Sequence, residues 1–155
     1  MKWNKTDFIQ YHKASEYIDN ILIPLMPFSL ENDNKTEKLA FQGELIDIFS
    51  NEIEKNYKGR IFLMPSYNYL STSSKENEIT RINGWINHAK RNPFTYVFFL
   101  TFDPHWKQFE TKLDGTLLWF PAITVGNLDG DETKAIISDQ IKQLSDLIQS
   151  YWKTK

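Results

Sequence analysis

The stretch that decides the fold is Phe94-Thr95-Tyr96-Val97-Phe98-Phe99-Leu100-Thr101-Phe102. It is the most hydrophobic segment of the chain, and its aromatic and β-branched residues favour a strand. The run is too short to cross a bilayer as a helix, whereas its length and composition suit a strand that is buried on both faces. We therefore predict that residues 94–102 form a strand in the middle of a β-sheet.

Three further apolar runs predict the other strands of this sheet. Residues 17–26 and residues 60–65 are short apolar runs, each closed by a proline. Residues 116–125 form the last run, and Pro121 interrupts it, so we expect an edge or a strand end there. The direction of this last strand stays open, because the preceding linker of roughly a dozen residues is near the minimum for a parallel crossover.

Amphipathic helices separate the predicted strands. Apolar side chains recur every three to four positions in residues 5–17, 34–59, 73–89 and 129–152, the spacing of one helical face. Helices that alternate with strands produce a parallel sheet with helices packed on it. We therefore predict a single α/β domain, residues 1–155, with a three-layer, mostly parallel open sheet of about four strands and helices on both faces, as in Rossmann-like and flavodoxin-like folds.

The composition excludes several classes of function. The chain has no cysteine, which removes disulfides, thiolate catalysis and cysteine-ligated metals. A net charge of −2, with Lys and Arg spread along the chain, provides no basic stripe for nucleic acid. The longest apolar run, residues 21–28, is too short for a membrane, and the N-terminal segment lacks the core of a signal peptide. We expect a cytoplasmic protein with no nucleic-acid partner and no membrane span.

No metal or cofactor motif is present. The six glycines form neither a dinucleotide fingerprint nor a phosphate-binding loop. The segment around Gly130 resembles a calcium loop, but aligning that glycine puts Val125 and Ile136 at the first and last ligand positions. His12 and His88 have no second ligand at a metal-binding spacing. The sequence therefore predicts no metal site and no cofactor.

Asp103 and His105 are the candidate catalytic residues. In an open parallel sheet, ligands bind outside the carboxyl ends of the strands, and both residues directly follow the predicted central strand. A carboxylate and an imidazole two positions apart can act as an acid/base pair or share a metal. The more ordinary role of an aspartate before a proline is to close a turn or to cap a helix.

Ser66, Tyr67 and Tyr69 are the candidate ligand-binding residues. They follow the strand at residues 60–65, in a hydroxyl-rich segment that we expect to be a loop as far as residue 73. Hydroxyl and backbone donors of such a loop can hold a sugar or a phosphate. The alternative is a polar loop that only caps the next helix.

Short motifs along the whole chain match one family of proteins: Met1-Lys2-Trp3, Ile23-Pro24-Leu25-Met26-Pro27, Gly43-Glu44, Gly59-Arg60, Leu63-Met64-Pro65, Phe98-Phe99-Leu100-Thr101, Gly115-Thr116-Leu117 and Ser138-Asp139-Gln140. Together they resemble the YpiF-like family of uncharacterised proteins from Gram-positive bacteria. The resemblance implies no assigned activity and no catalytic residue. Genes of this family tend to lie beside those of the menaquinol–cytochrome c reductase, which implies an accessory or assembly role for that respiratory complex.

Two functions remain open at this point. The first is a non-catalytic interaction or accessory module with a protein partner, which predicts an exposed aromatic patch drawn from Trp106, Trp119, Phe120 and Trp152. The second is a small-molecule-binding domain or enzyme that uses the crevice at the strand ends and the five candidate residues named above. Neither function fixes the oligomeric state.

Overall fold

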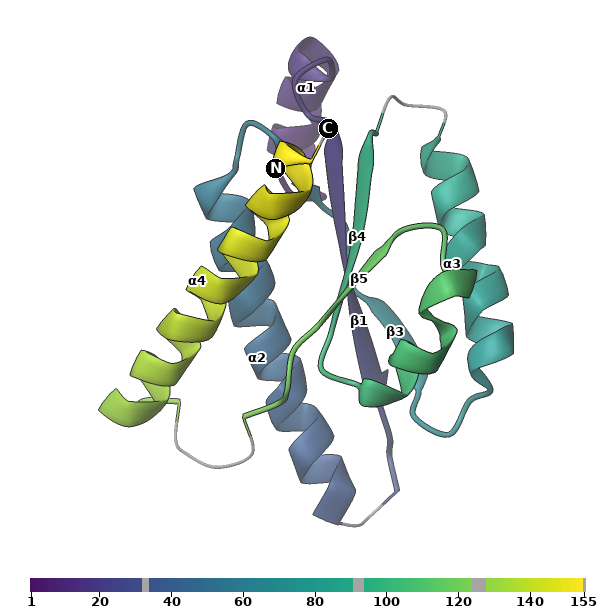
Figure 1. Cartoon of the computed structure of the whole chain (residues 1–155), viewed down its shortest axis with the longest axis vertical. Coiled ribbons are helices and arrows are strands. Elements are labelled where there is room, and N and C mark those ends of the chain that lie inside the picture. The colour runs from purple at the N-terminus through teal and green to yellow at the C-terminus, as the bar shows by residue number, and fades with distance from the viewer. Residues whose placement is uncertain (32–33, 91–93, 124–127, 155) are drawn as a thin grey trace. The chain divides into compact units, whose positions relative to one another are not determined.

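The chain divides into two compact units, residues 1–122 and residues 123–155. The first unit contains the whole sheet, and the second contains the C-terminal helix α4 (Asp131–Lys153) (Figure 1). The prediction of a single domain over residues 1–155 stays a prediction. The computed structural model describes residues 1–31, 34–90, 94–123 and 128–154.

The first unit is built on a five-stranded sheet whose described strand pairs all run parallel. The strand order is β2-β1-β4-β5, and β3 also pairs with β1. The fourth strand, β4, lies between β1 and β5, which confirms the central position predicted from residues 94–102. The strands are β1 (Asn20–Phe28), β2 (Ile61–Leu63), β3 (Tyr67–Leu70), β4 (Tyr96–Thr101) and β5 (Thr116–Trp119).

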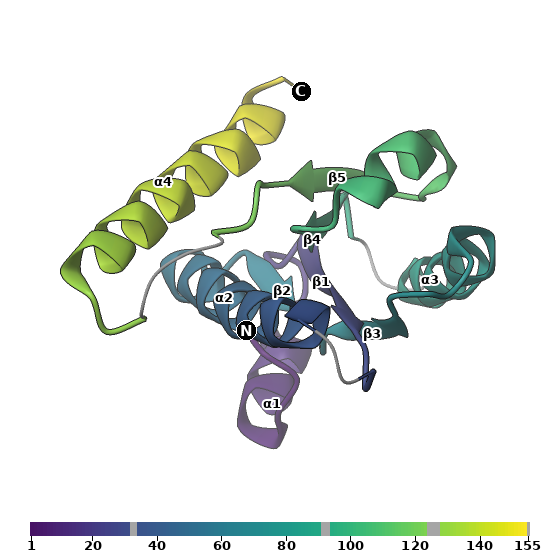
Figure 2. The same cartoon turned by 90° about the horizontal axis from the view of Figure 1, so that it is seen from below.

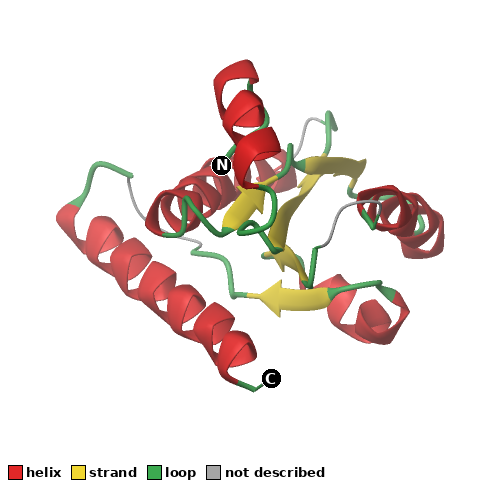
Figure 3. Ribbon diagram, turned by 90° about the horizontal axis from the view of Figure 1, so that it is seen from above, coloured by secondary structure: helices red, strands yellow, loops and turns green. Residues whose placement is uncertain are grey.

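Helices cover both faces of this sheet, as the sequence predicted. Helix α2 lies on one face, and α3 lies on the other together with the 3-10 helix η1 (Figures 2 and 3). The short helix α1 precedes β1 in the chain. The α/β class with three layers and a mostly parallel sheet is therefore confirmed. The helices of this unit are α1 (Lys5–Ala14), α2 (Asn34–Asn56), α3 (Lys75–Ala89) and η1 (Pro104–Lys112).

Each large helix packs on the sheet through an apolar stripe. Helix α2 buries Leu45, Phe49 and Ile53, at i, i+4 and i+8. On the opposite face, Ile79, Ile82 and Ile86 of α3 join one core cluster with side chains of β1, β4 and η1. Burial of such side chains stabilises the fold by about 1.5–3 kcal/mol each.

The prediction of a loop after residues 60–65 was wrong, because this segment contains strand β3. Leu22 of β1 pairs with Leu63 of β2, whereas Leu25 of β1 pairs with Tyr67 of β3. The edge strand therefore uses one residue more than β1 between the two pairs, which is the geometry of a β-bulge. Strands β2 and β3 form one edge strand that the bulge interrupts, and their short lengths hid this from the sequence.

The predicted ends of other elements shift by a few residues. The first strand begins at Asn20 and not at residue 17, because α1 ends at Ala14 and a turn follows. The last strand ends at Trp119, two residues before Pro121, which has no N–H to donate to a neighbouring strand. The end of the run predicted for that strand, residues 124–125, lies outside the described residues.

The C-terminal unit consists mainly of α4, and its helical prediction is confirmed. Ile137, Ile141, Leu144 and Ile148 recur at intervals of four, three and four residues, which places them on one face. Among the described residues, no helix combines the length and the apolar character needed to cross a membrane.

Gly115 stands where the chain enters β5 and passes close to β4. A Cβ atom at this position would lie 2.7 Å from Cε2 of Phe99 and 2.9 Å from the backbone oxygen of Val97. We expect Gly115→Ala to lower the free energy of unfolding by about 1–3 kcal/mol, because the buried strand cannot move away freely. Urea denaturation measures this loss.

Gly59→Ala is the matched control. A Cβ atom at Gly59 would meet nothing within 4 Å, so we expect no loss of stability there. Equal destabilisation of the two variants would contradict the close approach at Gly115.

Candidate functional site

A cluster of polar side chains surrounds Asp103, two residues after the end of β4; Tyr69, Lys75 and Trp106 are buried in it, whereas His105 is exposed. Its Oδ2 accepts a hydrogen bond from the Tyr69 hydroxyl at 2.8 Å and lies 3.2 Å from Nζ of Lys75. Its Oδ1 accepts a bond from the backbone N–H of His105 at 3.0 Å and lies 2.9 Å from the imidazole Nδ1. The Trp106 indole donates to the Tyr69 hydroxyl at 2.8 Å. Three of the five sequence-predicted residues, Tyr69, Asp103 and His105, therefore meet.

The local sequence explains how these groups come together. Asp103 is the N-cap of η1, and Pro104 occupies the first turn, as the ordinary alternative for an Asp-Pro pair predicted. Lys75 is the first residue of α3, and its buried ammonium lies 4.7 Å from the Tyr69 ring centroid and 5.0 Å from that of Trp106. The ion pair thus joins the start of α3 to the end of β4.

The environment changes the ionisation of this cluster. Burial raises the pKa of Asp103, but hydrogen bonds from Tyr69 and the His105 N–H, together with the Lys75 charge, outweigh it and hold that pKa below its ordinary value. Burial raises the pKa of Tyr69, and the negative charge of Asp103 raises it further. The cluster therefore contains an ionised carboxylate and a neutral phenol at neutral pH.

Tyr67 belongs to a second hydrogen-bonded group beside the first. Its hydroxyl donates to Oε2 of Glu78, and the Ser73 hydroxyl donates to Oε1 of the same carboxylate at 2.9 Å. Burial raises the pKa of Tyr67, and the hydrogen bond and charge of Glu78 raise it further. Ser66 does not join either group, since its hydroxyl donates to the side chain of Asn68 at 3.1 Å.

These contacts occupy the carboxylate and hydroxyl oxygens that acid/base catalysis or ligand binding would need. Both Asp103 oxygens have partners within the protein, and the Tyr69 hydroxyl both donates and accepts. The catalytic role of Asp103 and His105, and the ligand role of Ser66, Tyr67 and Tyr69, stay predictions. Sequence reasoning missed Lys75 and Glu78. Both lie in the first turn of α3, where they contact the two tyrosines of β3.

Beside the carboxyl end of β1, the described residues leave little space. A hollow of about 10 Å³ lies there, lined by Leu25, Met26, Gly43 and Phe102 among others. The Met26 side chain fills the space beside α2, since a Cβ at Gly43 would lie 3.5 Å from its sulfur. This volume is at the lower limit for one water molecule.

The predicted aromatic patch is wrong for Trp106, which is fully buried, and for Phe120, which is 7% exposed. Trp119 is partly covered, because the Lys107 ammonium lies 3.4 Å from its ring centroid. The exposed tryptophans of the first unit are instead Trp3 and Trp85, at 63% and 37% exposure.

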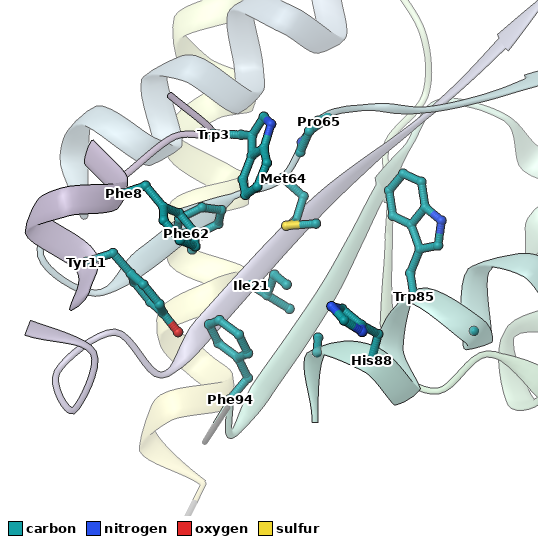
Figure 4. A pocket seen from close by; sticks show the side chains of 12 residues that line it. Trp3, Phe8, Tyr11, Ile21, Phe62, Met64, Pro65, Trp85, His88 and Phe94 are labelled. Atoms are coloured by element: carbon teal, nitrogen blue, oxygen red, sulfur yellow. The ribbon is translucent and has the colours of Figure 1, made fainter. Parts of the chain in front are cut away.

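Trp3 and Trp85 belong to the lining of a cavity of about 440 Å³ between α1 and α3 (Figure 4). Side chains from β1 and β2 line it as well, and the bulge contributes to the same lining. The residues that line the cavity are Trp3, Phe8, Tyr11, Ile21, Phe62, Met64, Pro65, Gly84, Trp85, His88, Ala89 and Phe94.

Aromatic contacts hold the α1 side of this cavity. The Tyr11 ring stacks on Phe8 at 5.5 Å and on Phe94 at 6.3 Å, and it meets Phe62 edge-on at 5.4 Å between centroids. Burial raises the pKa of Tyr11, whose hydroxyl has no hydrogen-bond partner among the described residues. The wall is thus apolar, with a neutral phenol at its inner side.

The parallel order β2-β1-β4-β5 with helices on both faces defines an α/β protein of the doubly wound type. The family model described as "Protein of unknown function (DUF2487)" matches residues 9–152, and the chain belongs to this family. It is 29% identical over 156 residues to "Uncharacterized protein YpiF" of Bacillus subtilis (strain 168), covering 99% of each chain. The resemblance to YpiF-like proteins is therefore confirmed. No solved structure matches the chain significantly.

Replacing Asp103 tests the charged cluster. We expect Asp103→Asn to lower the free energy of unfolding by about 1–3 kcal/mol at pH 7, because the buried Lys75 charge loses its partner. The folded-state pKa of Asp103 is lowered, so its stabilising effect is present above the unfolded pKa of about 4 and is lost as pH falls through the folded pKa. The difference between wild type and variant should therefore shrink below about pH 4.

Urea denaturation at a series of pH values measures this difference. Glu110→Gln, at an exposed carboxylate of the same 3-10 helix, is the control and should show neither the loss nor the trend. A difference that stays constant from pH 7 to pH 3 would exclude an ionised Asp103 as its cause.

Proposed function

We propose that this protein is a non-catalytic binding module that holds the apolar part of a small molecule in the cavity between α1 and α3. The observation that carries the proposal is the size and character of that cavity. Its volume of about 440 Å³ lies in the range of small-molecule sites, and most of its lining side chains are apolar or aromatic. A mostly apolar cavity with a few polar groups is the usual form of such a site.

The fold accounts for the position of this cavity. Helix α1 is only ten residues long and stands beside the amino ends of β1 and β4 (Figure 1), while α3 covers the region around β1, β3 and β4. Side chains of the sheet between them, Ile21, Phe62 and Met64, face the cavity. In Figure 4 the side chains of α1 and α3 approach this surface from opposite sides.

The geometry around Asp103 supports binding over catalysis. A general base must reach the proton that it removes, and Asp103 already uses both oxygens for partners within the protein. The cavity contains no candidate nucleophile paired with a base among its described lining residues.

Other parts of the proposal rest on the sequence and its family. We propose a cytoplasmic location, which the absence of cysteine supports, and one domain over residues 1–155. A protein partner, and an accessory role beside the menaquinol–cytochrome c reductase, remain predictions of the family resemblance.

The indole N–H signals of the five tryptophans provide a direct test by nuclear magnetic resonance. We expect titration with 2-methylnaphthalene to shift the signals of Trp3 and Trp85, which line the cavity, and to leave that of Trp106 unchanged. Trp→Phe variants assign the signals.

A blocking variant and a control complete this test. A Cβ at Gly84 meets nothing within 4 Å and faces the cavity, so Gly84→Leu should fill part of it and weaken binding at least about tenfold. Asn87→Leu places a leucine at an exposed position of the same helix outside the lining, and this variant should bind normally. Absence of any shift at Trp3 and Trp85 would rule out the proposed site.

A further inference from the structure

We infer that the ligand of this cavity is an aromatic carboxylate whose ring lies among the aromatic walls and whose carboxylate is bound by His88 at the mouth. The inference rests on the proposed function, because it names the ligand class of the same site. It follows from the polar groups of the lining, from their positions and from the shape that the walls favour.

The polar groups of the cavity lining are nearly all hydrogen-bond donors. The side chains that can offer an N–H or O–H are Trp3, Tyr11, Trp85 and His88. The described lining contains no Asp or Glu side chain and no Lys or Arg side chain. A ligand with acceptor oxygens therefore meets complementary groups, whereas a cationic ligand finds the faces of aromatic rings but no carboxylate to neutralise it.

His88 is the lining group best placed to bind an anion. Its side chain extends from α3 toward the cavity in Figure 4, and its residue is exposed, as is Trp85 one turn earlier on the helix. No hydrogen bond or ion pair of the His88 side chain occurs within the described residues, so a ring N–H is available to a ligand. A carboxylate at this mouth keeps part of its hydration and avoids the cost of full burial.

The inner walls favour a flat, apolar group. Phe8, Tyr11, Phe62 and Phe94 form a connected set of stacked and edge-on rings along one side of the cavity. Aromatic rings pack against such walls by the same offset and edge-on geometries. A ligand whose ring lies against these inner walls and whose acidic group lies at His88 makes favourable contacts with both parts of the cavity.

Three ligands that share the naphthalene ring but differ in charge distinguish the effect of charge on affinity from the effect of apolar contact. We expect 2-naphthoate to bind about tenfold or more tightly than 2-methylnaphthalene, since one hydrogen bond to a charged group is worth about that factor. The cation 2-naphthylmethylammonium should bind more weakly than 2-naphthoate, because the lining offers it no carboxylate. Dissociation constants come from the shifts of the Trp3 and Trp85 indole signals in the full-length protein.

Variants of His88 identify the group that makes the preference. His88→Ala should reduce the advantage of 2-naphthoate over 2-methylnaphthalene to about twofold or less, whatever affinity for 2-methylnaphthalene the variant retains. His88→Gln retains an N–H donor and should recover part of the advantage. His12→Ala removes an exposed imidazole of α1 outside the lining, against Phe8, and should change neither affinity.

The outcomes separate this inference from the proposed function. Equal binding of 2-naphthoate and 2-methylnaphthalene, with shifts at Trp3 and Trp85, would overturn the inference and leave the binding module standing. A preference for 2-naphthoate that persists in His88→Ala would overturn the role of His88. Failure of all three ligands to bind would overturn both.

Discussion

One extra residue in the edge strand is the constraint on which the rest of the first unit depends. Between its pairs with Leu22 and Leu25 of β1, the edge strand passes from Leu63 to Tyr67 and so gains one position. Side chains of a strand alternate between faces, and a shift by one residue exchanges the faces. Without the bulge, Ser66 and Asn68 would face α3, and the two tyrosines would face α2.

The bulge therefore determines what lies under α3. Tyr67 and Tyr69 point into the core beneath this helix, where their hydroxyls reach Glu78 and Asp103. Burying the Lys75–Asp103 pair costs desolvation, which only good geometry and further hydrogen bonds repay. The hydroxyl of Tyr69 and the N–H of His105 provide those bonds. This region of the sheet face is closed by polar contacts that are satisfied within the protein.

The same face is open on the other side of the bulge. Met64 and Pro65 of the bulge line the cavity together with Phe62, and among the described residues α1 and α3 supply the helical walls on either side (Figure 4). A closed ionic cluster and an open apolar cavity thus lie on one face of the sheet. Their contrast is the reason to place ligand binding in the cavity and to assign the Asp103 cluster a supporting role in the fold.

The family relation and the fold define an α/β protein of the YpiF-like family, and neither of them assigns a function. The relation to the YpiF-like protein of Bacillus subtilis extends over nearly the whole of both chains. Doubly wound α/β folds serve many functions, so function has to be argued from particular side chains. Here those side chains surround a cavity at the amino ends of the strands, away from the crevice where such folds most often bind their ligands.

The sequence by itself determined the α/β class, the central strand around Phe98 and Phe99, and the four amphipathic helices, because hydrophobic periodicity is a local property. It also indicated that Asp103 caps a turn. Only the tertiary structure decided the position of the bulge, the burial of Trp106 and the cavity between Trp3 and Trp85. These depend on the register between strands far apart in the chain, and a short edge strand such as β3 has too few residues to reveal that register.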